Sequence, residues 1–224
     1  RLSSDIDGDG TYEGISSNLL FSILPSKTFA LSATANSQVE SGKPFRLLVR
    51  AEDEFFNLQR DFDGFVYVRD EHEELIGEIS LVDGIGSGEV KLNSLGAHRL
   101  RLQAENPSLV GRSNPIRVFT KTPDEKLFWG DIHGHTGISD GLGRTREAYF
   151  RYGRDVAALD VIALTDHGQV DWRGNQLAAQ KFNDPGKFIT ILAQEAGVVP
   201  DHMNIYYRKD DMDHLKQWTM SYEG

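Results

Sequence analysis

The first half of the chain consists of short apolar or alternating stretches separated by Gly, Asn, Asp and Pro. Side chains alternate faces along a strand, so short alternating runs between turn residues predict β-strands, and little in this half is typical of a long amphipathic helix. We predict strands at residues 28–33, 45–51, 64–69, 74–81, 87–92, 98–104 and 116–119. About seven short strands indicate an all-β sandwich of immunoglobulin-like type.

The pattern changes after residues 121–125, a polar Lys-Thr-Pro-Asp-Glu segment at which we place a domain boundary. The elements predicted beyond it alternate between strand and helix: strand 126–132, helix 145–154 with Thr145 as its cap, strand 161–164, helix 170–182, and strands 188–193 and 203–207. Such alternation predicts a mostly parallel α/β sheet, closed or open. We therefore divide the chain into an acidic leader (1–16), a β-sandwich domain (17–121) and an α/β domain (122–224).

Polar side chains that can bind metals fall near the ends of successive predicted strands of the second domain. They are His133 and His135, Asp166 and His167, Glu195 and His202. The carboxyl ends of parallel strands form one rim, which brings residues far apart in sequence together. His133 and His135, two residues apart in an extended segment, share a face and can bind one ion. Converging imidazoles and carboxylates are what a catalytic metal requires.

Three segments carry a resemblance to a known family: Gly-Asp-Ile-His-Gly-His-Thr at 130–136, Ser-Asp-Gly at 139–141 and Ala-Leu-Thr-Asp-His at 163–167. They resemble the first two motifs of the PHP (polymerase and histidinol phosphatase) family of metal-dependent hydrolases, especially its large bacterial branch with an upstream immunoglobulin-like β-domain. The resemblance implies a distorted β/α barrel that holds two or three metals, commonly zinc, manganese or iron, and that hydrolyses phosphoesters.

The same resemblance implies roles for individual residues. The implied metal ligands are His133 and His135 for a first ion, Glu195 between the first and second, His202 for the second, and Asp140 and His167 for a third. Asp166 and Glu195 are the expected catalytic carboxylates, with Asp166 placed to orient an imidazole. Trp172 and Arg173, just after the second motif, are the expected substrate contacts.

The sequence also departs from the family pattern, because no final Asp-x-His motif of the expected kind follows His202. About a hundred residues cannot close a barrel that is normally built from about twice that number. We therefore expect a partial barrel and a chain that is a fragment. The first residue, Arg1, is compatible with a removed signal peptide, a cloning boundary or a missing start.

The acidic leader resembles the opening of a calcium-binding loop. Asp5, Asp7, Asp9 and Glu13 place oxygen ligands at suitable positions, with glycines between them. Ser16 stands where an EF-hand loop has its bidentate Glu, so a polar, flexible terminus is an equal alternative. Two histidines of the first domain, His72 and His98, are assigned no role.

The amino-acid composition limits the kinds of partner that the chain is expected to bind. A net charge of -10, with both halves acidic, argues against binding to nucleic acid. No apolar run approaches the roughly 20 residues of a membrane span, and the absence of Cys excludes thiolate ligands without fixing the compartment. A secreted or periplasmic location is favoured over a cytoplasmic one.

The sequence thus predicts a metal-dependent hydrolase, a phosphoesterase acting on a small phosphorylated molecule through a metal-activated water. Two alternatives stay open: a noncatalytic metal-containing binding module, and a metallohydrolase of carboxylic esters or amides.

Overall fold

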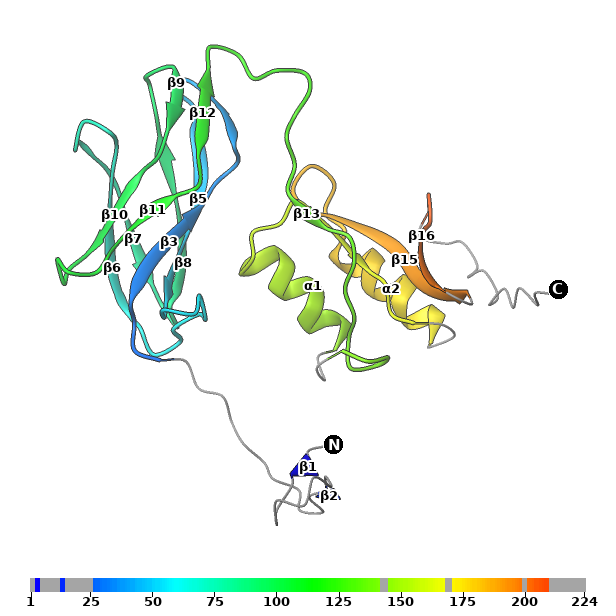
Figure 1. Cartoon of the computed structure of the whole chain (residues 1–224). Helices are drawn as coiled ribbons and strands as arrows, with labels where there is room; N and C mark the ends of the chain where they lie inside the picture. Colours follow the sequence, from blue (N-terminus) through cyan, green and yellow to red (C-terminus); the bar gives the residue numbers. More distant parts are fainter. Residues whose placement is uncertain are drawn as a thin grey trace, which may run out of the picture.

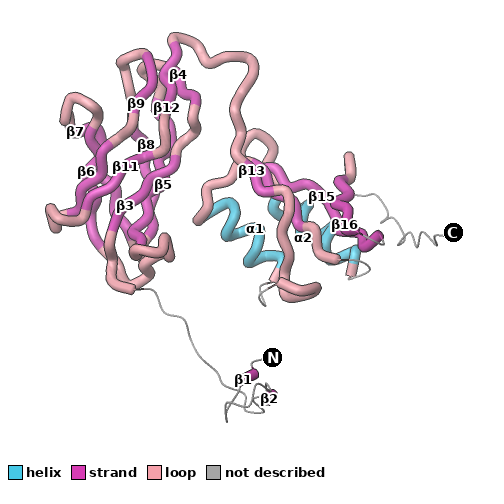
Figure 2. The backbone as a smooth tube through the Cα atoms, viewed as in Figure 1, coloured by secondary structure: helices cyan, strands magenta, loops and turns pink. Residues whose placement is uncertain are grey.

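The computed structural model describes residues 3–4, 13–14, 26–141, 145–167, 171–198 and 201–209. Figure 1 shows two parts joined by one extended segment: a β-sandwich, and a smaller part in which two helices accompany a sheet. Strands occur in both parts, whereas the helices of the described residues lie in the second part alone (Figure 2).

The sandwich contains a seven-stranded sheet in the order β7-β6-β10-β11-β3-β5-β8. Its strands are β3 (Ala30–Thr34), β5 (Pro44–Glu52), β6 (Gly64–Arg69), β7 (Leu75–Leu81), β8 (Ile85–Lys91), β10 (Arg101–Ala104) and β11 (Val110–Ser113). A three-stranded sheet, in the order β4-β12-β9, completes it with β4 (Gln38–Glu40), β9 (Gly96–His98) and β12 (Ile116–Phe119). Near the start of the chain, β1 (Ser3–Ser4) pairs antiparallel with β2 (Glu13–Gly14).

The core of the sandwich follows from the alternation of side chains along its strands. In β6, Val66 and Val68 are fully buried while the residues between and beside them are more exposed. Leu47, Val49 and Ile116 are also fully buried, and they belong to strands of both sheets. Apolar burial of this kind is the main favourable term in folding. The structure therefore contains a β-sandwich, as predicted, built from a seven-stranded and a three-stranded sheet.

One predicted strand, 98–104, is two strands in different sheets, β9 and β10. Between them Leu100 is fully buried and exchanges hydrogen bonds with Ser113: Leu100 N donates to Ser113 Oγ at 2.9 Å, and Ser113 N donates to Leu100 O at 3.0 Å. The chain crosses from one sheet to the other at this point, and an apolar pattern alone does not reveal the crossing. The short strands β4 and β11 were not predicted.

The second part has a four-stranded sheet in the order β13-β14-β15-β16. Its elements are β13 (Gly130–Asp131), α1 (Arg146–Asp155), β14 (Val161–Leu164), α2 (Trp172–Phe182), β15 (Ile189–Val198) and β16 (Asp201–Tyr206). Thr145 caps α1 as predicted, because its side chain accepts from Ala148 N. Both helices pack on the sheet through one apolar cluster, in which Phe150 of α1 stacks on Phe182 of α2 with ring centroids 5.6 Å apart.

The predicted barrel is wrong. Strands β13, β14 and β15 are parallel, but β16 pairs antiparallel with β15 from Ala193↔Tyr206 to Val198↔Asp201. A β/α barrel requires each strand to be followed by a helix and then by a parallel neighbour. Here β15 and β16 instead form an antiparallel pair at one edge of the sheet. Within the described ranges, the second part is a small open mixed sheet with two short helices, and strands dominate the chain.

Among the described residues, several hydrogen bonds join the two parts. Arg50 Nη1 donates to Val156 O at 2.8 Å, Leu127 N donates to Gln38 Oε1 at 2.8 Å, and Trp129 Nε1 donates to Ser37 Oγ at 2.9 Å. Val156 is the C-terminal cap of α1, so the Arg50 guanidinium also meets the negative end of the helix dipole. A cavity of about 760 Å³ between the parts is lined by residues of both.

Among the described residues, no helix combines the length and the apolar character that crossing a membrane requires.

Candidate metal centre

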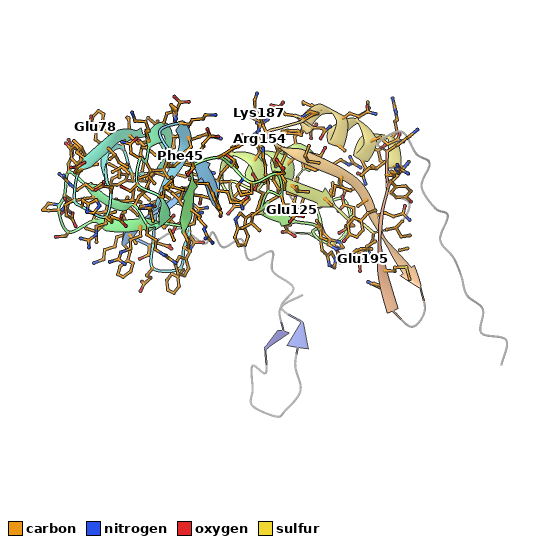
Figure 3. All side chains as sticks on the ribbon, turned by 90° about the horizontal axis from the view of Figure 1, so that it is seen from above. Phe45, Glu78, Glu125, Arg154, Lys187 and Glu195 are labelled. Atoms are coloured by element: carbon orange, nitrogen blue, oxygen red, sulfur yellow. The ribbon has the colours of Figure 1, made fainter. Side chains whose placement is uncertain are left out.

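Four imidazoles surround the carboxylate of Glu195, which Figure 3 labels on β15, on the side of the second part away from the sandwich. Its Oε2 lies 3.1 Å from His133 Nε2 and 2.8 Å from His135 Nε2. The two histidine Nε2 atoms are 3.2 Å apart. Its other oxygen, Oε1, lies 2.8 Å from His202 Nδ1, and His167 Nε2 lies 3.8 Å from Oε2. Glu195 therefore faces imidazoles with both of its oxygens.

The sheet brings these side chains together. His133 lies two residues beyond the end of β13, and His167 lies just beyond β14, where it forms a parallel bridge with Glu195. His202 of β16 is paired with Gly197, two residues from Glu195 on the same face of β15. The rim of parallel strand ends that the sequence predicted is thus completed by one antiparallel strand.

Burial makes this carboxylate dependent on cationic partners. Glu195 is 5% exposed, whereas the side chains of His133 and His202 are 54% and 59% exposed. Burial raises the pKa of Glu195, but the hydrogen bonds from His133 and His202 and the charges of His167 and His135 outweigh it, and the pKa is lowered. Glu195 is therefore held as an anion, and the open side chains leave one side of the group accessible.

A second carboxylate, Asp140, lies against two of the same histidines. Its Oδ1 is 2.8 Å from His135 Nδ1, and its Oδ2 is 3.3 Å from His167 Nε2. Because His135 presents Nε2 to Glu195, its Nδ1 is available to donate to Asp140, the arrangement by which a carboxylate orients a metal-binding imidazole. Burial raises the pKa of Asp140, but the charges of His135 and His167 and the Ser139 hydroxyl lower it on balance.

Asp166 holds the loop that carries the histidines. It is 1% exposed, and it accepts hydrogen bonds from Thr136 N at 2.7 Å, Thr136 Oγ1 at 2.7 Å and Ser139 Oγ at 2.8 Å. Next to it, Thr165 N donates to Gly134 O at 2.9 Å, and Gly134 N donates to Thr165 Oγ1 at 3.1 Å. The Thr-Asp-His segment thus fixes the backbone on both sides of His135, and Asp166 acts on the loop rather than on an imidazole.

Tyr149 of α1 is a supporting residue that the sequence analysis missed. Its hydroxyl donates to Ala163 O at 3.0 Å, and a Cβ on Gly134 would lie 2.3 Å from that hydroxyl. Burial, followed by the charges of Asp131 and Asp166, raises the pKa of Tyr149 above its usual value. Glycine between the two histidines is therefore required by a neutral phenol packed beneath it. In the sequence, the glycine between the two histidines was the one indication that another residue packs closely at this point.

The two predicted substrate contacts lie at the start of α2. Arg173 Nη1 donates to Gln176 Oε1 of its own helix at 3.2 Å, and the Trp172 ring lies 5.0 Å from the Tyr207 ring. Of the predicted calcium ligands, Asp5, Asp7 and Asp9 lie outside the described residues. Glu13 belongs to β2.

The donor set suits a divalent metal. Ligand bonds of about 2.0–2.2 Å in a tetrahedral site place neighbouring donor atoms about 3.3 Å apart. The Nε2 atoms of His133 and His135 and the Oε2 of Glu195 are 2.8–3.2 Å from one another, which is close to that spacing. Two further groups of three, namely His135, Asp140 and His167, and His167, Glu195 and His202, also bring one donor atom each within 4.8 Å. The residues present therefore fit a metal, with neighbouring groups sharing ligands.

Comparison with known proteins identifies two relatives but does not assign the chain to a family. No family model matches the chain. It is 30% identical to an uncharacterized protein of Chlamydia muridarum (strain MoPn / Nigg), over 70% of this chain and 27% of that protein. It is 30% identical to an uncharacterized protein of Chlamydia trachomatis serovar D over 73% of this chain and 29% of that protein. The chain thus spans less than a third of the length of these relatives.

The chain is also similar to several solved structures, all of which it matches only loosely. They include the CARDB domain of the PF1109 protein from Pyrococcus furiosus, with TM-score 0.29, 12% identity, and coverage of 40% of this chain and 90% of that one. The PKD domain of an M14-like peptidase from a Thermoplasmatales archaeon matches with TM-score 0.29, 12% identity, and coverage of 42% and 98%. Domains 4–9 of the surface layer protein SbsC match with TM-score 0.34, 15% identity, and coverage of 53% and 18%.

The predicted membership of the PHP family is wrong. No family model matches, and the described sheet ends in an antiparallel pair where that family's barrel would continue. The short motifs that carried the resemblance specify how strand ends present metal-binding side chains, and such local solutions do not define a fold. What this chain does must therefore be argued from its own site.

Proposed function

We propose that the second part of this chain is the centre of a metal-dependent hydrolase, with phosphoesters as its first substrate class. The observation that carries the proposal is the position of Glu195, one oxygen facing His133 and His135 and the other facing His202. Such a carboxylate could help to hold two neighbouring divalent ions together with the imidazoles on each side, and a pair of ions would supply the charge that promotes hydrolysis.

The openness of the group favours catalysis over a purely structural metal. Structural zinc sites are closed by four protein ligands, whereas catalytic sites keep a position for water or substrate. The first group offers three donors, from His133, His135 and Glu195, and the His133 side chain is 54% exposed. A small phosphorylated molecule is the proposed substrate, and a secreted or periplasmic location is the proposed setting.

Bound divalent ions such as zinc, manganese or iron would supply positive charge that polarises a phosphoryl oxygen and lowers the pKa of water towards neutrality. The chain's own residues contribute by holding charge and by fixing the positions of the metal-binding side chains. Glu195 holds a negative charge in a buried setting, and Asp140 orients the His135 ring. Asp166 and Thr165 keep the loop between the two histidines in one conformation. Within this proposal Asp166 is a positioning residue.

The test is to measure the metal content of the purified chain by elemental analysis, together with turnover of chromogenic phosphomonoesters, phosphodiesters, carboxylic esters and amides. We expect metal content to fall in Glu195→Gln and in His133→Ala/His135→Ala, with turnover reduced by at least about 100-fold, more than loss of an outer-shell partner costs. Glu125→Gln, in the exposed linker, is the matched control and should change neither quantity.

The pattern of results separates the alternatives. Turnover confined to carboxylic esters or amides would move the proposal to another hydrolase class. Metal binding without turnover of any ester would favour a noncatalytic binding module. Unchanged turnover in the double histidine variant would refute the site.

A further inference from the structure

A second group of metal-binding side chains lies in the β-sandwich, away from the centre described above. It consists of Glu71 and His72, in the turn between β6 and β7, and His98, the last residue of β9. Glu71 Oε1 lies 3.2 Å from His98 Nδ1 and 3.6 Å from His72 Nε2. One carboxylate oxygen therefore stands between two imidazoles.

His98 is the unusual member of this group, because it is 5% exposed. Within the described part of the chain, neither of its ring nitrogens has a hydrogen-bond partner, and its close approach to Glu71 lacks the alignment of a hydrogen bond. Buried polar atoms are paired in the great majority of folded proteins, so an orphaned pair of imidazole nitrogens requires an explanation. The Nδ1 atom lies 3.2 Å from a carboxylate oxygen, and a cation shared by the two would satisfy both groups.

The spacing of one pair, His98 and Glu71, matches neighbouring ligands of a metal site. Bonds of about 2.0–2.2 Å to a tetrahedral ion separate neighbouring donors by about 3.3 Å, and the distance from His98 Nδ1 to Glu71 Oε1 is 3.2 Å. The His72 side chain is 66% exposed. It can therefore rotate about its side-chain bonds at little cost and bring its imidazole to the same ion.

The turn itself is rigid and negatively charged. Asp70 Oδ1 accepts from His72 N at 2.8 Å and from Glu74 N at 3.0 Å, and Arg69 Nη1 donates to Glu73 O at 3.0 Å. These bonds fix the backbone that carries Glu71 and His72. The turn holds four carboxylates between residues 70 and 74, of which Glu73 is paired with Arg101, and the remaining carboxylates favour a cation.

We propose that Glu71, His72 and His98 form a metal site of the sandwich that binds a borderline divalent ion such as zinc, nickel or copper. A donor set of two imidazoles and one carboxylate favours these ions over calcium and magnesium, which prefer oxygen ligands. Three protein donors leave the fourth position of a tetrahedral ion for water. It is independent of the hydrolase proposal, since it uses other residues in the other part of the chain.

The experiment is a zinc titration by calorimetry on the chain carrying His133→Ala, His135→Ala, His167→Ala and His202→Ala, which removes every imidazole of the first centre. We expect about one zinc equivalent to remain bound, with affinity reduced at least tenfold by either Glu71→Gln or His72→Ala. Glu78→Gln, at an exposed position of the neighbouring strand β7, is the matched control and should bind as its parent does. No zinc binding in the parent, or binding indifferent to both changes, overturns the proposal.

If the fourfold variant does not fold, a second measurement tests the same proposal. In the otherwise unaltered chain, His72→Ala and the volume-conserving His98→Leu should each lower the zinc stoichiometry by one equivalent. Both variants should keep the far-ultraviolet circular dichroism of the parent, and His98→Leu should abolish any zinc-dependent rise in the melting temperature of the sandwich. An unchanged stoichiometry in both folded variants overturns the proposal.

Discussion

Trp129 Nε1 donates a hydrogen bond of 2.9 Å to Ser37 Oγ, and this bond ties the residue before β13 to the sandwich. The backbone N of the same Trp129 donates to Asp160 Oδ2 at 2.8 Å, just before β14. Trp129 is therefore held by both parts of the molecule, four residues before His133 of the metal centre.

The first prediction concerns this link between the parts. Trp129→Phe and Ser37→Ala should each lower the free energy of unfolding, with about 0.5–1.5 kcal/mol for the lost hydrogen bond, towards the lower end because the indole is half exposed. Ser37 also accepts from Asn114 Nδ2 at 3.4 Å, so a double-mutant cycle in urea isolates the indole bond. Strictly additive effects of the two changes would contradict an energetic contribution from this bond.

The second prediction concerns the glycine between the two histidines. Gly134→Ala would place a Cβ 2.3 Å from Tyr149 Oη and 2.9 Å from Tyr149 Cε2, so either the loop or the Tyr149 ring, which is held by its hydrogen bond to Ala163 O, must shift. We expect metal affinity to fall at least tenfold, the scale of losing a supporting contact in a metal site. Titration with zinc is the measurement.

A compensating change tests the cause of that loss. Combining Gly134→Ala with Tyr149→Leu removes the phenol and should restore part of the affinity. If Gly134→Ala alone binds zinc like the parent, the phenol does not constrain the loop.

The third prediction is a pH dependence at the end of β5. Asp53 accepts from Ser26 N, Phe55 N and Asn57 N, each at 2.9 Å, and from Asn57 Nδ2 at 3.0 Å. Burial opposes ionisation, but these hydrogen bonds outweigh it and lower the pKa of Asp53 from 3.8 to about 2. A lowered folded-state pKa stabilises the fold above about pH 4, and the stabilisation is lost as the pH falls towards 2.

Asp53→Asn should therefore lower the urea midpoint at pH 6, and the difference from the parent should shrink between pH 4 and pH 2. Glu54→Gln, at the exposed neighbouring position, is the control and should show no such convergence. A difference that stays constant from pH 6 to pH 2 would show that the ionised carboxylate is not what matters.

The fourth prediction concerns the small core beneath the metal centre. Phe150 is 1% exposed and stacks on Phe182. Phe150→Ala should cost about 3–5 kcal/mol, the usual loss for a fully buried aromatic side chain. Chemical denaturation followed by circular dichroism measures it. Phe150→Leu, which keeps most of the volume, should cost less, and equal losses in the two variants would indicate that packing at this position is not limiting.

Local features of the sequence were sufficient to predict several elements of the second part. Thr145 and the amphipathic segment after it located α1, and the apolar run Val161–Leu164 located β14. The spacing of His133 and His135, and the position of His167 after a buried strand, also indicated the side chains that the structure brings to Glu195. Capping, periodicity and strand ends are properties of neighbouring residues, so sequence alone reports them well.

The sequence by itself therefore indicated the imidazoles that the structure brings to Glu195 and located the two helices and the buried strand β14 of the second part. The tertiary structure decided how they combine: β16 pairs antiparallel with β15, which rules out the barrel and sets His202 beside Glu195. It also turned Asp166 towards Thr136 and Ser139 rather than towards an imidazole, and left His98 buried beside Glu71. Strand direction and side-chain partners across a sheet depend on contacts between distant segments, and no local pattern of residues encodes those contacts.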